Sequence, residues 1–321
     1  MIRVRPFRNT DPPYLVEVWR SQPPLRGLAQ PISVRHLEEL VFSKPYFDRE
    51  GLLVAESDEG TIVGFVHAGF GATDDLSSLS TEMGAICLLL VADGQPYEAV
   101  AAPLMHAAES YLRRRGAKLL YAGGVFPLNP FYLGLYGGSE MPGVLESDGR
   151  LLEFFQHHEY EPISSISVLQ RSLTGFRPLV DRGQMQIRRS YQIEAVLDPP
   201  AQNWWEACTF GHTDRTRFDL YPRGSRERAA TVTFWHIEPL ASSWGVHAVG
   251  MINLETAPAL RRKGLATFLV GESLRQLQTH GVTLVEAQTL EQNIAAQGLY
   301  RKLGFEAVDR GIVLRKASSG V

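Results

Sequence analysis

The chain has 321 residues, of which 44% are hydrophobic, so it can bury the core of a globular protein, and its length predicts two domains of about 150 residues each. Its formal net charge of −3 at pH 7 gives no general attraction to nucleic acid or to an anionic membrane, and we expect neither as a partner. The N-terminus lacks an apolar signal core, and the longest apolar run, 85–92, is too short to span a bilayer, so we expect a cytoplasmic protein.

The first half alternates between strands and helices, as in an α/β protein with a mixed sheet. Gly, Pro and Asp clusters separate the elements, and the run 85–91 does not alternate, which indicates a strand buried on both faces. The expected elements are a strand at 2–6, a helix ending near Arg20, a helix capped by Ser33, a hairpin of 52–56 and 61–68, the buried strand, a helix over 98–115 and a strand at 118–122.

A second domain is expected from residue 179, after the linker 174–178. We therefore divide the chain into domains 1–173 and 179–321. The expected elements of the second domain are a short helix around Trp204, strands at 217–221, 229–237, 246–256 and 282–287, helices from 266 to about 280 and from 293 to 304, and a last strand at 311–314.

A basic turn, Arg261–Ala266, joins the end of a strand to a helix. A turn that opens a helix presents free backbone N–H groups and the positive end of the helix dipole to an anion, and diphosphate suits such a site. Gly264 and Ala266 keep bulky side chains away from the backbone, while Arg261, Arg262 and Lys263 add positive charge.

A second segment, Asn293–Phe305, follows the next strand. It reads as a helix that starts at Asn293, carries Leu299 and Tyr300, and stops at Gly304. Together the two segments resemble the GNAT superfamily of N-acetyltransferases, through its Arg/Gln-x-x-Gly-x-Gly/Ala loop and its Asn-x-x-Ala-x-x-Leu-Tyr segment.

The resemblance implies two tandem GNAT acyl-CoA N-acyltransferase domains, with acetyl-CoA as the co-substrate and a small-molecule or peptide amine as the acceptor. In the family, the strand end before the turn binds the pantetheine arm and the thioester oxygen, and the tyrosine protonates the leaving thiolate, which assigns Tyr300 as general acid. The implied acetyl-CoA-binding residues are Leu254, Thr256, Arg261, Arg262, Lys263, Gly264, Leu265, Ala266 and Asn293.

The general base stays open. Glu255 leaves the strand beside the expected thioester site, His247 lies near the start of the same strand, and His212 with Asp214 precedes it. A water chain to solvent would also serve. Metal-ligand spacing is absent from the sequence, so we expect no metal.

The first half repeats the second with its acetyl-CoA loop degraded. At an offset of about 164 residues, Asn129 and Tyr136 correspond to Asn293 and Tyr300. The counterpart of the basic turn is Pro96–Ala101, which lacks the glycine and carries an acidic residue, so we expect this half to bind CoA weakly or not at all. A tandem chain with one degenerate half also resembles the architecture of the mycothiol synthase family, which does not transfer that family's substrate.

Several features leave alternatives open. The Gly-rich segment 137–149 suits a lid over a pocket or a surface loop. Aromatic residues around Trp204, Trp205 and Phe218 suit either an acceptor pocket for a planar amine or a core. The chain could also be a CoA-responsive binding protein without turnover, and the oligomeric state is open.

Overall fold

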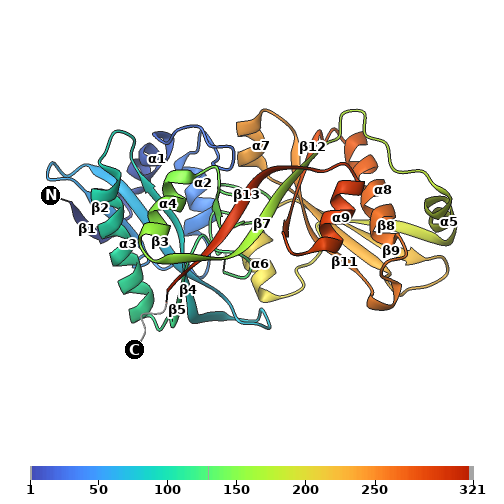
Figure 1. The fold of residues 1–321 in the computed structure, drawn as a ribbon, viewed down its shortest axis with the longest axis horizontal. Helices are drawn as coiled ribbons and strands as arrows, with labels where there is room; N and C mark the ends of the chain where they lie inside the picture. Colours follow the sequence, from blue (N-terminus) through green and yellow to red (C-terminus); the bar gives the residue numbers. More distant parts are fainter. Residues whose placement is uncertain (1, 129, 318–321) are drawn as a thin grey trace. The chain divides into compact units, whose positions relative to one another are not determined.

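The computed structural model describes residues 2–128 and 130–317 and divides into two compact units (Figure 1). The first unit comprises the chain up to Ile166, the segment Ala201–Gly211 and the C-terminal residues from Arg310. The second comprises Ser167–Pro200 and His212–Asp309. These units differ from the segments 1–173 and 179–321 because strands β7 (Tyr160–Ser172) and β13 (Glu306–Lys316) each contribute residues to both units.

The first unit is built on a mixed sheet in the order β1-β2-β3-β4-β5, which the C-terminal part of β13 extends. Only β4 and β5 of this series run parallel, and α3 connects them. Strand β3 is buried along its whole length, because α3 and α1 both pack against it. The bounds are β1 Arg3–Pro6, α1 Pro12–Arg20, α2 Val34–Leu37, the π-helix η1 Glu38–Phe42, β2 Leu52–Glu56, β3 Ile62–Ala72, β4 Leu79–Val91, α3 Tyr97–Arg114, β5 Leu119–Ala122, β6 Val144–Leu145 and α4 Gly149–His157.

Helix α6 (Trp204–Phe210) packs in the first unit although it lies far along the chain. The Trp205 ring lies 4.9 Å from the Tyr46 ring, centroid to centroid, and the Lys44 ammonium donates to two carbonyl groups at the end of α6 at 3.1 Å each. Trp205 is therefore a core residue of this unit. Phe218 is likewise buried, in the core of the second unit, which favours the core interpretation of both rings.

The segment 137–149 is neither a lid nor a surface loop. Most of it is buried, and β6 within it pairs with β13, Leu145 opposite Gly311. A Cβ atom at Gly311 would lie 1.9 Å from the Pro142 carbonyl oxygen, so only glycine allows this close approach of the two backbones. The sequence could not show this, because the partner strand lies more than 160 residues later.

The proposed correspondence of Tyr136 with Tyr300 is wrong, because Tyr136 does not lie on a helix. Tyr136 lies in an irregular segment, where its hydroxyl accepts the Leu145 N–H at 3.0 Å, and Asn129 lies outside the described residues. The counterpart of the helix Ile294–Lys302 (α9) is instead α4. Glu159 follows α4 and Gly304 follows α9, and both have a positive φ, 62° and 77°. When these two residues are aligned, Phe155 corresponds to Tyr300, because each lies four residues earlier.

The second unit has the same plan. Its sheet runs in the order β7-β12-β11-β10-β9-β8, with β11 and β12 parallel and connected by α8, whose apolar face packs on the sheet. Strand β8 and helices α5 and α7 are additional to the predicted elements; the Asp181 carboxylate caps α5 by accepting the Gln184 N–H at 2.8 Å. The bounds are α5 Arg182–Ser190, β8 Tyr191–Leu197, β9 Arg215–Pro222, β10 Ala230–His236, α7 Glu238–Trp244, β11 Ala248–Thr256, the 3-10 helix η2 Pro258–Leu260, α8 Leu265–Thr279 and β12 Leu284–Leu290.

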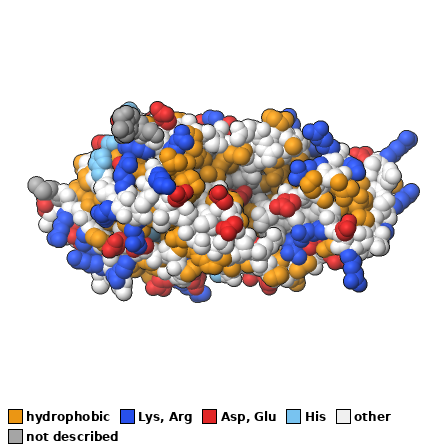
Figure 2. Space-filling view, turned by 90° about the horizontal axis from the view of Figure 1, so that it is seen from below, with side chains coloured by type: hydrophobic (Ala, Val, Ile, Leu, Met, Phe, Trp, Pro, Cys, Tyr) orange, Lys and Arg blue, Asp and Glu red, His pale blue; other side chains and the backbone are white. Residues whose placement is uncertain are grey.

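Basic and acidic side chains are interspersed on the face drawn in Figure 2. This agrees with the small net charge of −3. Among the described residues, every helix is too short or too polar to cross a membrane.

Candidate functional site

A gap opens in the sheet of the second unit between β11 and β12. The two strands pair from Ala248, opposite Leu284, to Met251, opposite Ala287. Pairing stops there, although β11 continues to Thr256 and β12 to Leu290. The far part of β11 therefore offers a backbone edge on its β12 side, where an extended ligand with amide groups could bind as a strand does.

A β-bulge bends β11 at the mouth of this gap. On β10, Thr231 and Thr233 are two residues apart, while their partners Glu255 and Ile252 are three apart. The extra residue is accommodated where Asn253 has a φ of 52°. A bulge redirects backbone groups out of the ladder, so this bend can aim N–H groups of β11 at a bound molecule.

Helix α8 begins with an open N-terminus. Gly264 is its N-cap, with φ 80° and ψ 2°, and no side chain caps the helix. The first intrahelical bond runs from the Phe268 N–H to the Gly264 carbonyl at 3.0 Å. The amides of Leu265, Ala266 and Thr267 find no acceptor among the described residues, so three donors and the helix dipole face outward.

The far end of β11, which follows the bulge, and the α8 N-terminus line one cavity of about 1290 Å³. This volume exceeds that of most drug-sized pockets, so the cavity can hold a large ligand. Lys263 and Tyr300 do not line it. The implied site residues that do are Leu254, Glu255, Thr256, Arg261, Arg262, Gly264, Leu265, Ala266 and Asn293.

Tyr300 is next in sequence to a residue that lines the cavity but does not line it itself. Its side chain is buried in the core, with its ring 5.4 Å from that of Phe305, while the preceding Leu299 lines the cavity. Asn293 caps α9, because its side-chain oxygen accepts the Ala296 N–H at 3.2 Å. Asn293 thus lines the cavity, whereas Tyr300 packs in the core beneath α9.

Of the side chains considered as general base, only Glu255 reaches the cavity. His247 precedes it by eight positions on an extended strand, which separates them by about 25 Å. Its Nε2 lies 3.2 Å from Nδ1 of His236, with the two rings stacked. His212 and Asp214 lie at this same far end of the sheet, since the Asp214 carbonyl accepts the His236 N–H.

The lining residues that the sequence did not single out include Arg228 and Thr231. Both contact Asp219 of β9. The pairing of β9 with β10 brings Asp219 and Thr231 together. In the sequence, the alternation of polar residues in these two strands indicates a polar face.

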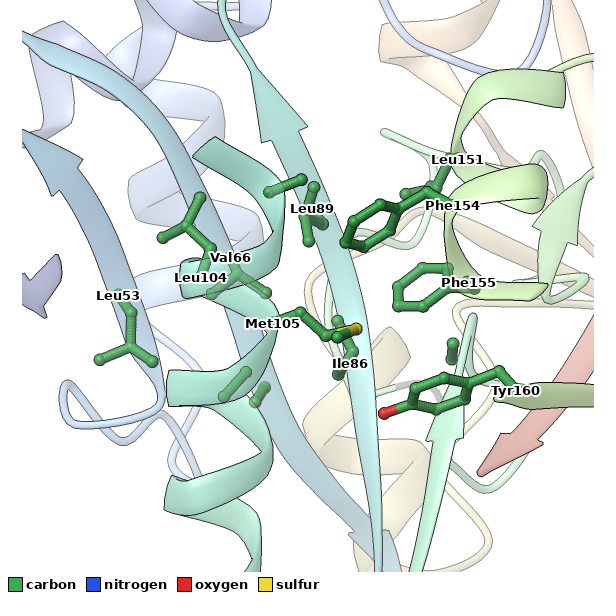
Figure 3. Close-up of a cluster of buried hydrophobic side chains, with 14 of the residues drawn as sticks. Leu53, Val66, Ile86, Leu89, Leu104, Met105, Leu151, Phe154, Phe155 and Tyr160 are labelled. Atoms are coloured by element: carbon green, nitrogen blue, oxygen red, sulfur yellow. The ribbon is translucent and has the colours of Figure 1, made fainter. Parts of the chain in front are cut away.

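The equivalent gap in the first unit is filled by side chains (Figure 3). Strands β4 and β5 stop pairing at Ile86, opposite Ala122, although β4 continues to Val91. Phe154 and Phe155 of α4 point at this part of β4, and a cavity of only about 10 Å³ remains.

The turn before α3 is covered as well. The Tyr97 ring packs edge-on against Phe154 at 5.7 Å, and the Arg150 guanidinium lies 5.4 Å from the centroid of the same ring. The Glu98 carboxylate lies 2.7 Å from Nε2 of His158. An anion at this turn would therefore meet an aromatic ring and a carboxylate.

The C-terminal part of the chain is similar in sequence to a known protein family. Residues 185–305 match the acetyltransferase (GNAT) family. A search of curated proteins found no match.

Three solved structures share the fold over nearly the whole chain. A tandem GNAT protein from the clavulanic acid biosynthesis pathway matches with a TM-score of 0.65 at 17% identity, covering 100% of this chain and 99% of its own. A GCN5-related N-acetyltransferase from Sphaerobacter thermophilus gives 0.58 at 15% identity, with 98% and 95% covered. The GCN5-related glucosamine N-acetyltransferase region of a fungal multi-domain β-N-acetylglucosaminidase gives 0.71 at 15% identity, and the match covers 98% of this chain but 38% of the fungal one. At these identities the likeness concerns the fold, which is a mixed α/β GNAT fold in tandem.

Proposed function

We propose that the second unit, most of which matches the acetyltransferase (GNAT) family, transfers an acetyl group from acetyl-CoA to an amine. The observation that carries the proposal is the meeting of the open α8 N-terminus with the unpaired edge of β11 in one cavity. Diphosphate suits the first and an amide-containing pantetheine arm suits the second.

Binding of the donor would divide between these two features. The amides of Leu265, Ala266 and Thr267 would hold the diphosphate, with Arg261 and Arg262 adding charge from the cavity wall. The helix dipole alone contributes about 0.3–1 kcal/mol, so directed hydrogen bonds must supply most of the selectivity. Lys263 is exposed beside the cavity and would add to the local potential.

The chemical step is a direct transfer. The amine nitrogen attacks the thioester carbonyl, a C–N bond forms, the C–S bond breaks, and the amine loses a proton while the thiolate gains one. Backbone N–H groups of Leu254–Thr256 at the bulge would stabilise the oxyanion, and a donor of this kind is typically worth about 10²–10³ in rate. Holding both reactants in one cavity supplies a further large factor.

Two side chains would move the protons. Glu255, which lines the cavity, would accept the proton of the attacking amine. Tyr300 would donate to the departing thiolate, a role worth about 10²–10⁴-fold for a positioned acid. The covered turn and filled gap of the first unit support confining acetyl-CoA to the second.

Two measurements test the proposal together. Calorimetric titration with acetyl-CoA should show one site per chain, and a thiol-release assay with an amine library should show sustained turnover. Absence of acetyl-CoA binding would overturn the proposal, and binding without turnover of any amine would favour a CoA-responsive binding protein.

A further inference from the structure

A buried carboxylate organises the polar face of the second unit beside the cavity. Asp219 of β9 is 1% exposed. Its Oδ1 accepts hydrogen bonds from the Thr231 hydroxyl at 2.7 Å and from Arg228 Nη1 at 3.3 Å, and its Oδ2 accepts from Arg217 Nε at 3.0 Å. A buried charge needs such partners, so these contacts fix the positions of all three donors.

The cluster leaves positive charge at the cavity wall. Two guanidinium groups share one carboxylate, which leaves a net charge of about +1. Arg228 lines the cavity, and its side chain is 38% exposed. Its Nε and Nη2 groups have no partner within the described part of the chain, so the guanidinium can still bind an anion through two parallel N–H groups.

A carboxylate stands beside this guanidinium. Glu255 of β11 lies directly opposite Thr231 of β10, and Thr231 lies opposite Asp219, so the three side chains share one face of the sheet. The Arg228 guanidinium and the Thr231 hydroxyl bond the same oxygen of Asp219, so they are neighbours on this face. This part of the cavity wall therefore presents a cation, Arg228, near an anion, Glu255.

Strand order places this pair on the acceptor side. β11 lies between β12 and β10, the gap for the donor opens on the β12 side, and the Asp219 cluster lies on the β10 side. A molecule held by Arg228 thus approaches Glu255 from the side opposite to the donor arm. An amine on that molecule would meet the thioester at the end of β11.

We propose that the acceptor is a small α- or ω-amino carboxylate, whose carboxylate binds Arg228 and whose amino group faces Glu255. This inference rests on the proposed function, because it assigns the acceptor side of that same cavity. Asp219 and Thr231 are positioning residues for Arg228. Glu255 takes one proton from the ammonium form, and the free amine then forms the new C–N bond.

A binding experiment tests the inference without requiring turnover. The twenty standard amino acids, a series of ω-amino acids from β-alanine to 6-aminohexanoate, and the primary carboxamide of each are titrated against the protein saturated with CoA. At least one acid should bind about 10- to 100-fold more tightly than its carboxamide, because an ionic hydrogen-bond pair to arginine is lost in the amide. Equal binding of acids and carboxamides, or binding by no compound of the panel, would overturn the inference.

Variants of Arg228 sharpen the result. Arg228→Gln should abolish the preference for the acid, and Arg228→Lys, which keeps the charge but loses the planar fork, should retain a smaller one. If the glutamine variant unfolds, the lysine variant alone tests the inference, through the expected decrease in the preference for the acid. The matched control is Arg226→Gln in the same hairpin turn, an exposed residue that does not line the cavity, and it should leave the preference unchanged.

Two further arms separate this inference from its alternatives. The dissociation constant of CoA should stay within about threefold in Arg228→Gln; a loss comparable to that of the acid would assign Arg228 to the CoA phosphates and overturn the inference. Thiol release with the best acid then tests the proposed function separately. Acid-selective binding without turnover would support the binding of an amino carboxylate by Arg228 and contradict the proposed catalysis.

Discussion

Gly264 gives the sharpest test of the diphosphate site. It caps α8 in the left-handed region, with φ 80°, and a Cβ atom there would lie 3.3 Å from Gln184 Nε2 and 3.6 Å from Ile187 Cδ1. A side chain at this position therefore costs about 1–2 kcal/mol of backbone strain, with slight crowding. Gly264→Glu adds a carboxylate at the proposed diphosphate site.

The effect on binding should be much larger than the effect on stability. At about 5 Å and an effective dielectric constant of 20, each charge pair repels by about 3 kcal/mol, so acetyl-CoA should bind about 10²–10³-fold more weakly. The strain should lower the melting temperature by about 2–8 °C. Calorimetric titration measures the first effect and thermal unfolding the second.

Gly281 provides a matched control at the other end of α8. Its φ is 86°, so Gly281→Glu imposes similar strain and the same change of charge. The helix separates the two positions by about 22 Å, more than twice the Debye length at 0.1 M salt. Gly281→Glu should lower the melting temperature comparably and leave the dissociation constant within about twofold. Similar loss of binding in both variants would refute the assignment of the diphosphate site.

Three further predictions concern single side chains. Tyr300→Phe should lower kcat by about 10²-fold or more with acetyl-CoA affinity unchanged, and an unchanged kcat would remove the tyrosine from the mechanism. Asp219→Asn should lower the free energy of unfolding by about 3 kcal/mol, because Arg217 and Arg228 lose their shared carboxylate. Denaturant unfolding measures this loss, with Glu227→Gln as the exposed control. A loss below about 1 kcal/mol would contradict the prediction. Burial lowers the pKa of His67 from 6.5 to about 3, so the neutral ring contributes stability that is complete above about pH 6.5 and is lost as pH falls toward 3. His67→Phe should therefore flatten the pH dependence of unfolding between pH 6 and 4.5 by about 1.4 kcal/mol per unit, and parallel curves for the two proteins would show that the ring does not titrate in this way.

Local sequence was sufficient to predict most elements and the two segments that line the proposed donor site. The basic turn has a glycine in the left-handed region at the start of a helix, and Asn293 caps the next helix with its side chain. Both features depend on residues that are neighbours in the sequence, so the sequence predicts them. The periodic apolar positions of α8 and α3 likewise predicted their buried faces. These features depend on backbone preferences over a few residues.

The remaining features depend on contacts between distant residues. The β11 bulge lies at Asn253, which has a positive φ; asparagine tolerates this conformation, but a single asparagine does not locate a bulge. Arg228 and Asp219 meet only through the register of β9 and β10. Matching Tyr136 to Tyr300 by spacing alone was wrong, because the buried insertion with β6 shifts the first-half helix to α4. Only three-dimensional pairing reveals that shift.

A crystal of the protein soaked with CoA tests the central claim most directly. Density for the diphosphate should lie against the N–H groups of Leu265, Ala266 and Thr267, with the pantetheine arm along β11 beyond Met251. Diphosphate density at the α3 turn beside Tyr97, or outside the cavity that Gly264 lines, would contradict the account.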